Sequence, residues 1–106
     1  MKHKYRVIEL TKGFVAIIDA DDFHRVNKFS WNTHRSAGKG RKQGNPYARG
    51  RVKGKLTYLH RFVMGEVPVE MHVDHLNHQT LDCRKSNLEI VTNTENQKRR
   101  RDRKNG

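Results

Sequence analysis

Four residues in the C-terminal third of the chain have side chains that could together hydrolyse a phosphodiester bond. They are Asp74, His75, Asn87 and Asn96. A carboxylate and an amide oxygen are hard ligands of the kind that Mg²⁺ or Mn²⁺ prefers, and an imidazole can take a proton from water. A metal ion that stabilises charge on a phosphate, beside a base that makes the nucleophile, is the equipment of phosphodiester hydrolysis.

A strand, a loop, a second strand and a helix must bring these residues together. The pattern predicts strands over Met71–His75 and Asn87–Val91, joined by a long loop rich in Asn, His, Asp and Thr. If the helix that follows packs across this hairpin, Asp74 and Asn96 converge on one point. On an ideal strand Asp74 and His75 would face opposite sides, so the strand must end or twist there if both are to serve.

The start of the helix is marked by a capping box. Thr92 and Glu95 have the spacing at which a hydroxyl and a carboxylate close the first turn. The helix is then expected to run through Asn96 into the basic tail. Asn93 is the nearest rival to Asn96 as a metal ligand, but at the helix start it is better suited to capping.

Each candidate also has a purely structural explanation. His75 could be a surface histidine after a strand, Asp74 a turn cap, and Asn96 an exposed helix residue. A zinc site is a further alternative, because histidines recur at every third position near His60 and Cys83; they are His72, His75 and His78. That spacing would form one face of a helix, and Val73 and the loop residues argue against a helix here.

Length and composition limit the classes of protein to consider. The chain has 106 residues, of which 33% are hydrophobic and 32% charged, so we expect one domain without a sizeable pocket for a small organic substrate. No apolar run approaches a membrane span, and no apolar segment follows the basic N-terminus as in a signal peptide. One cysteine, Cys83, allows no intrachain disulfide and suits a reducing compartment.

The charge points to a polyanionic partner. Lys and Arg number 23 against 11 Asp and Glu, which gives a net charge of +12. No acidic residue lies between Asp22 and Glu66, whereas eleven basic residues lie between Arg25 and Arg61. A second basic block, Lys98–Lys104, closes the chain. A small chain with this charge usually binds a polyanion, although a solvated surface and a basic tail would look the same.

The N-terminal half reads as short strands. A hairpin is expected over Tyr5–Leu10 and Phe14–Asp19, then a short helix from the Asp19–Asp22 caps to Ser30, and a strand at Trp31–Arg35. A Gly-rich loop leads to a second hairpin, Tyr47–Val52 and Leu56–Leu59, and a helical turn at His60–Met64. Trp31, Phe23 and Phe29 are expected in the core, whereas Tyr47 and Tyr58 could pack or stack on bases.

The spacing His75-x11-Asn87-x8-Asn96 resembles the motif of the HNH endonuclease family, which has the ββα-metal fold. The residues around the motif strengthen the likeness, which covers roughly residues 56–101. Within the family, the chain looks like phage and intron-encoded homing endonucleases and their freestanding relatives. The matching segments are Tyr58-Leu59-His60-Arg61-Phe62-Val63, Val73-Asp74-His75, Asn87-Leu88-Glu89-Ile90-Val91-Thr92 and Glu95-Asn96-Gln97. Many members have His where this chain has Asn96, and Asn occurs there in the homing-type and resolvase-type branches.

The resemblance implies an α+β fold, with a small N-terminal β-sheet region followed by a C-terminal ββα-metal motif. Residues 1–55 would form a basic, β-rich DNA-binding region of the same compact unit, with a vague likeness to plant AP2-type modules, and residues 56–106 the nuclease region. His75 resembles the general base, Asp74 and Asn96 the ligands of one Mg²⁺ or Mn²⁺ ion, and Asn87 the structural asparagine that orients His75. Family products carry a 5′-phosphate and a 3′-hydroxyl.

The expected partner is DNA, and neither a membrane nor a small-molecule substrate is expected. We expect a monomer in the cytoplasm of a bacterial host cell, with a phage gene as one source. The residues expected to bind DNA are Arg41, Lys42, Arg49, Arg51, Lys53, Arg61, Lys98, Arg99 and Arg100. Arg41 and Lys42, in the Gly-rich loop, would grip phosphates, whereas Arg49, Arg51 and Lys53 could be aimed at base edges. The alternative function is a non-catalytic nucleic-acid-binding protein that keeps the ββα shape.

Overall fold

A computed structural model of the chain describes residues 4–35 and 44–98 and has an α+β fold. The strands and helices, in chain order, are β1 (Tyr5–Glu9), β2 (Val15–Asp19), η1 (Ala20–Asp22), α1 (Phe23–Val26), β3 (Trp31–His34), β4 (Tyr47–Val52), β5 (Lys55–Tyr58), α2 (Leu59–Met64), β6 (His72–His75), η2 (Lys85–Asn87) and β7 (Leu88–Val91). Residues 93–98 are helical. The predicted α+β class is therefore confirmed, and among the described residues no helix is long and apolar enough to cross a membrane.

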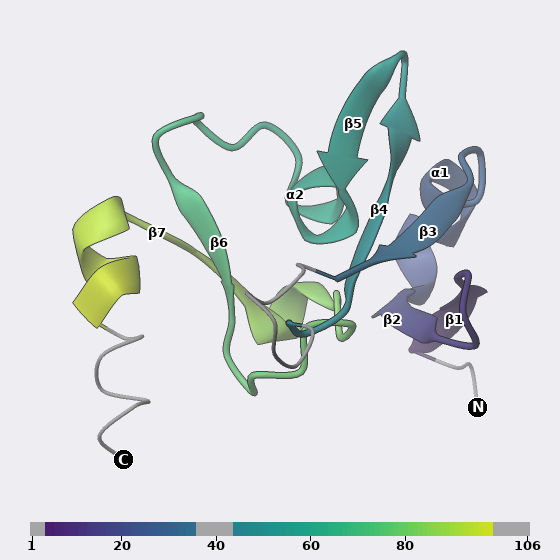
Figure 1. Cartoon of the computed structure of the whole chain (residues 1–106), viewed down its shortest axis with the longest axis horizontal. Helices are drawn as coiled ribbons and strands as arrows, with labels where there is room; N and C mark the ends of the chain where they lie inside the picture. Colours follow the sequence, from purple (N-terminus) through teal and green to yellow (C-terminus); the bar gives the residue numbers. More distant parts are fainter. Residues whose placement is uncertain (1–3, 36–43, 99–106) are drawn as a thin grey trace.

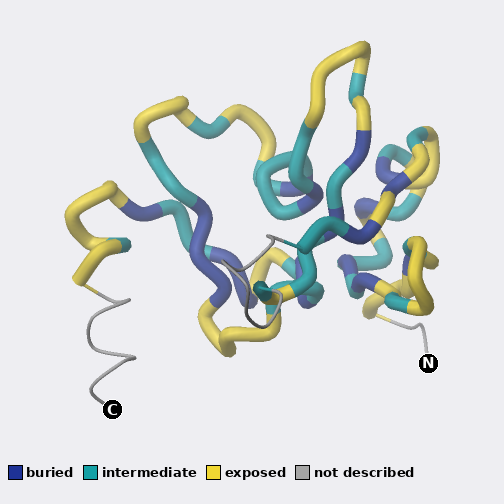
Figure 2. Tube along the Cα trace, viewed as in Figure 1, coloured by how far each residue is buried: buried dark blue, intermediate teal, exposed yellow. Residues whose placement is uncertain are grey.

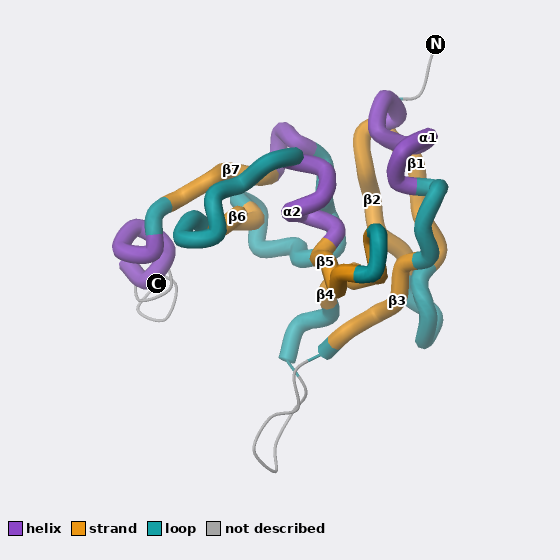
Figure 3. Tube along the Cα trace, turned by 90° about the horizontal axis from the view of Figure 1, so that it is seen from above, coloured by secondary structure: helices purple, strands orange, loops and turns teal. Residues whose placement is uncertain are grey.

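The described residues form three small antiparallel sheets (Figure 1). β1 pairs with β2, β3 pairs with β4 and β4 with β5, and β6 pairs with β7. Figure 3 shows α2 between the β6–β7 hairpin and the three-stranded sheet. α2 follows β5 without a loop, so the sheet and the C-terminal hairpin are joined through one short helix.

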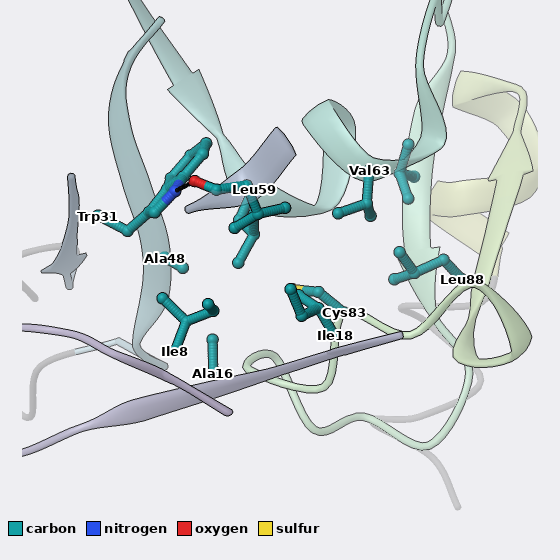
Figure 4. Close-up of a cluster of buried hydrophobic side chains, with 11 residues drawn as sticks. Ile8, Ala16, Ile18, Trp31, Ala48, Leu59, Val63, Cys83 and Leu88 are labelled. Carbon is teal, nitrogen blue, oxygen red and sulfur yellow. Dashed lines mark hydrogen bonds between the residues drawn. The ribbon is translucent and has the colours of Figure 1, made fainter. Parts of the chain in front are cut away.

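One hydrophobic core joins the N-terminal and C-terminal halves. It includes Ile18 and Ala48 from the first half and Leu59, Val63 and Cys83 from the second, all nearly inaccessible to solvent. Figure 4 shows these side chains converging between β2, β4, α2 and the loop after β6. The chain trace in Figure 2 is buried along the same segments and exposed at the hairpin tips.

Backbone hydrogen bonds also tie β2 to the loop that precedes β7. The Ile17 amide donates to the Leu81 carbonyl at 2.8 Å, and the Cys83 amide donates to the Ile17 carbonyl at 2.7 Å. The Lys85 amide donates to the Asp19 carboxylate at 2.9 Å. The N-terminal hairpin thus supports the loop on which the predicted site depends.

Three sequence-based assignments need correction. The segment expected to be one helix to Ser30 is a 3-10 turn followed by the single turn of α1, because the run is too short to propagate. Asn87 does not open β7; it ends the 3-10 turn η2, where its side chain is held inside the loop. Asn93 does not cap the helix, because Thr92 does so. The side-chain oxygen of Asn93 instead lies 3.1 Å from His72 Nε2.

Candidate active site

One open cavity of about 660 Å³ brings three of the four predicted site residues together. Asp74, His75 and Asn96 all line it. The remaining lining residues come mostly from the ends of β3, β4 and β5, from α2 and from the β6–β7 loop; they are His34, Asn45, Tyr47, Tyr58, His60, Arg61, His72, Val73, His78 and Thr80. Asn87 is not among them. The cavity therefore has a polar wall on the C-terminal hairpin and an aromatic wall made by Tyr47, Tyr58 and His60.

The end of β6 positions Asp74 and His75. In the β6–β7 pairing, Asp74 stands opposite Glu89, and His75 stands opposite Leu88 as the last pair of the ladder. Both side chains are buried, with Asp74 7% and His75 6% exposed. Neighbours on a strand point to opposite faces, yet both residues border the cavity, which all four residues of β6 line. The geometric conflict anticipated from the sequence therefore does not keep Asp74 and His75 apart.

The helix after β7 presents Asn96. The Thr92 hydroxyl accepts from the Glu95 amide at 3.1 Å, and the Glu95 carboxylate accepts from the Thr92 hydroxyl at 3.0 Å, so the predicted capping box is formed. The Asn96 amide donates to the Thr92 carbonyl at 2.9 Å and begins the helical ladder. This fixes the turn on which the half-buried Asn96 lines the cavity.

Asn87 braces the loop directly after His75. Its side-chain oxygen accepts from the Asn77 amide at 2.9 Å, and its side-chain nitrogen donates to the Asp82 carbonyl at 2.9 Å. Its own carbonyl accepts from the Leu76 amide at 2.8 Å. Asn87 is 6% exposed, so these bonds fix the chain on both sides of the loop without reaching the cavity.

Asp82 is a second buried brace that the sequence reasoning missed. Its carboxylate accepts from Arg84 at 2.8 and 2.6 Å and from the Asn77 side chain at 3.0 Å. The Arg84 hydrogen bonds hold the pKa of Asp82 below its ordinary value. Nothing in the local sequence separates this aspartate from a surface loop residue, because its role depends on the folded loop.

The aromatic wall is the other feature that sequence reasoning left undecided. Tyr47, Tyr58 and His60 contact one another with ring centroids 5.4–5.9 Å apart. The His60 ring also meets His75 at 4.9 Å, and His34 meets Tyr58 at 6.3 Å. Burial, with smaller effects from His75 and Arg61, lowers the pKa of His60 to about 3, so this imidazole is neutral near pH 7.

Several basic residues form contacts inside the fold. Arg25 pairs with Asp22, Arg84 pairs with Asp82, and Lys85 lies 3.3 Å from Asp22. Arg61, expected to bind DNA, donates instead to the carbonyls of Met71, Val67 and Pro68 and fixes the segment leading into β6.

Four of the other expected DNA-binding residues lie within the part of the chain that the structure describes. Arg49 is half-buried on β4, and Arg51, Lys53 and Lys98 are exposed. Arg41, Lys42, Arg99 and Arg100 lie outside the described residues.

The zinc alternative receives no support from the part of the chain that the structure describes. No group of three or more His, Cys, Asp or Glu side chains there is placed to hold a metal ion. Cys83 lies in the hydrophobic core, and burial raises the pKa of its thiol to about 12, so it is not a thiolate near neutral pH.

The donor set of the cavity suits a magnesium-type ion better. One carboxylate, from Asp74, and one amide oxygen, from Asn96, border the same space. Mg²⁺ is usually held by one or two protein oxygen ligands and keeps several water molecules or phosphate oxygens. Asp74 and Asn96 thus fit such an ion, and His75 borders the same cavity as the candidate base.

Comparison with known proteins bears on the same segment. Residues 58–98 match the family described as HNH endonuclease. The chain is 30% identical over 90 residues to an uncharacterized HNH endonuclease of Acanthamoeba polyphaga mimivirus. That similarity covers 80% of this chain but 43% of the viral protein, so the chain spans less than half the length of this relative. No solved structure matches the chain.

Proposed function

Because the chain belongs to the HNH endonuclease family, we propose that it is a metal-dependent DNA endonuclease. It hydrolyses phosphodiester bonds with one Mg²⁺ or Mn²⁺ ion and leaves a 5′-phosphate and a 3′-hydroxyl. The observation that carries the proposal is the placement of Asp74, His75 and Asn96 around one cavity. A protein that only binds nucleic acid does not need a carboxylate, an imidazole and an amide oxygen around one cavity.

Each of these side chains has a distinct task in the proposed reaction. His75 takes a proton from the attacking water, which makes a nucleophile beside the phosphate. Asp74 and Asn96 would hold the ion, which when bound would offset the negative charge that develops on the phosphate and the leaving oxygen. Asn87 and Asp82 keep the loop after His75 in place, so that the imidazole faces the cavity.

The His60 ring contributes a neutral boundary to this reaction. It packs edge to face on His75 and brings no positive charge near pH 7, because its pKa is about 3. A charged neighbour would disfavour the protonated form of His75 that proton transfer creates. A neutral, half-buried ring instead limits the motion of the base without opposing its protonation.

A supercoiled plasmid assay tests the proposal. The protein is incubated with plasmid in Mg²⁺ and, separately, in EDTA, and the ends of the products are analysed by end-labelling and ligation. We expect nicked circles to form first, because one active site in a monomer cuts one strand, and we expect EDTA to abolish cleavage. Cleavage that persists in EDTA would contradict the metal requirement.

The alternative function, a non-catalytic nucleic-acid-binding protein, predicts a different result from the same assay. The positive charge of the chain supports both functions equally. Retardation of the plasmid on a gel without any cleavage in Mg²⁺ or Mn²⁺ would favour the alternative.

A further inference from the structure

The two faces of the β3–β4–β5 sheet have opposite character. Cross-strand neighbours share a face, and the register places Trp31, Thr33, Ala48 and Gly50 on the inner face. All four are buried. The opposite, outer face carries polar, basic and aromatic side chains together with one exposed leucine; they are Asn32, His34, Tyr47, Arg49, Arg51, Leu56 and Tyr58.

The outer face runs directly into the candidate active site. His34, Tyr47 and Tyr58, at one end of it, line the cavity with His75. At the other end, Asn32, Arg49, Arg51 and Leu56 line a second hollow of about 490 Å³, which also includes His34. The two hollows therefore share one lining residue, His34. Figure 3 shows β4 and β5 beside α2, which joins this sheet to the hairpin of His75.

The charge of this face is available to a partner. Arg49 and Arg51 form no ion pair with the carboxylates of the described residues, in contrast to Arg25 and Arg84. Arg49 lies over the Tyr58 ring at 5.9 Å, and Arg51 makes a single 3.3 Å bond to the Gly54 carbonyl. No acidic residue occurs between Asp22 and Glu66. None of the three strands therefore carries a carboxylate that would repel a phosphate-rich partner.

We propose that this outer face docks in a groove of duplex DNA and reads base pairs immediately beside the phosphate that is cut. The proposal rests on the proposed endonuclease function. A small β-ribbon fits the major groove, where Arg recognises guanine, Asn recognises adenine and an apolar side chain contacts the thymine methyl group. Arg49 or Arg51, Asn32 and the 55% exposed Leu56 supply one of each kind.

The geometry sets the spacing between recognition and cleavage. Tyr47, which contacts His75, and Arg51 are four residues apart on β4. At about 3.4 Å per residue this is about 14 Å, which corresponds to about four base pairs along DNA at 3.4 Å each. The bases contacted by Arg49, Arg51 and Asn32 should therefore lie within about six base pairs of the cut.

The first experiment selects duplexes from a randomised pool in EDTA, so that it depends on binding and not on cleavage. Wild-type protein should enrich a short consensus. Arg49→Ala together with Arg51→Ala should reduce the preference for that consensus over a scrambled duplex by about tenfold or more, as expected for lost bidentate contacts. Lys4→Ala with Lys12→Asn removes the same charge from the β1–β2 hairpin, which contacts the buried inner face of the sheet through Thr11 and Thr33, and should leave the preference unchanged.

The second experiment measures the spacing without relying on the enzyme's own activity. Leu76 is 46% exposed and directly follows His75, whereas Cys83 is 1% exposed, so an iron chelate attached to a Leu76→Cys variant marks the DNA nearest to the residue beside His75. We expect cuts within about six base pairs of the consensus. Cuts a full helical turn away from the consensus would overturn the proposal. Equal effects of the two double variants would also overturn it, as would a preference for single strands or RNA. Inactivity on plasmid with a positive result here would refute only the endonuclease function.

Discussion

The imidazole rings of His60 and His75 lie 4.9 Å apart in a T-shaped contact. His60 comes from α2 and His75 from the end of β6, so this contact joins the aromatic wall of the cavity to its polar wall. Tyr47 closes the cluster with ring contacts to both histidines. The candidate base is therefore held by the N-terminal sheet as well as by its own hairpin.

His60 should make the stability of the protein depend on pH. Its pKa is lowered from 6.5 to about 3 in the fold, so the unfolded chain binds the proton more tightly. The contribution of His60 is thus fully present above pH 6.5 and is lost as the pH falls toward 3, at about 1.4 kcal/mol per pH unit. Urea unfolding at pH 7 and pH 5 measures this difference.

The matched variant for that measurement is His60→Gln, which stays neutral at every pH. It should show a smaller loss of unfolding free energy between pH 7 and pH 5 than the wild type. His24→Gln, at an exposed position, serves as the control. Equal pH dependence in the wild type and His60→Gln would mean that His60 is not held neutral by the fold.

Asn87→Ala should destabilise the loop after His75. The substitution leaves the Asn77 amide and the Asp82 carbonyl without their present partner, and each such loss costs about 1–3 kcal/mol. Chemical denaturation should show this decrease, and cleavage should fall with it. Asn27→Ala, at an exposed position after α1, should change neither quantity; a comparable loss in that variant would show that the effect is not specific to the brace.

Asp74→Ala and Asn96→Ala should each raise the Mg²⁺ concentration needed for half-maximal cleavage. The effect of Asp74→Ala should be larger, because the carboxylate carries a formal charge and the amide does not. Diffraction from crystals soaked in Mn²⁺ should place one anomalous peak between these two residues. A peak at His60, His72 or Cys83 in its place would favour the zinc alternative.

Gly50→Ala should weaken the three-stranded sheet. A β-carbon at this position would collide with the Ser30 carbonyl oxygen and lie 3.1 Å from the Trp31 ring. Such overpacking costs about 1–3 kcal/mol, so the thermal midpoint should fall by several degrees. Thr57→Ala, at the position paired with Gly50 on β5, gives the comparison; if it lowers the midpoint as much, the close approach of Ser30 is not the cause.

Local patterns in the sequence predicted the parts of the site that depend on short-range rules. The capping box at Thr92 and Glu95 is formed because both partners lie in one helical turn. The hairpin turned at Lys53-Gly54 is formed because both residues adopt the positive φ that this turn needs. The grouping of Asp74, His75 and Asn96 followed from the family resemblance together with the strand–loop–strand–helix order.

Long-range contacts could not be predicted in the same way. Tyr47 reaches His75 only because the core packs the N-terminal sheet against α2. Asp82 becomes a buried brace only after the loop folds around it, and β2 holds that loop through backbone bonds that carry no side-chain pattern. Arg61 looked like a phosphate ligand, since its carbonyl partners lie six to ten residues away in an irregular segment.

The central claim, that His75 generates the nucleophile in this cavity, is tested most directly by one rate comparison. Plasmid cleavage by His75→Ala is measured beside the wild type at saturating Mg²⁺, and DNA affinity of both is measured in EDTA. Loss of a general base typically lowers the rate about 10²–10⁴-fold, and we predict that loss with nearly unchanged affinity. A His75→Ala variant that cuts DNA at the wild-type rate would contradict the assignment.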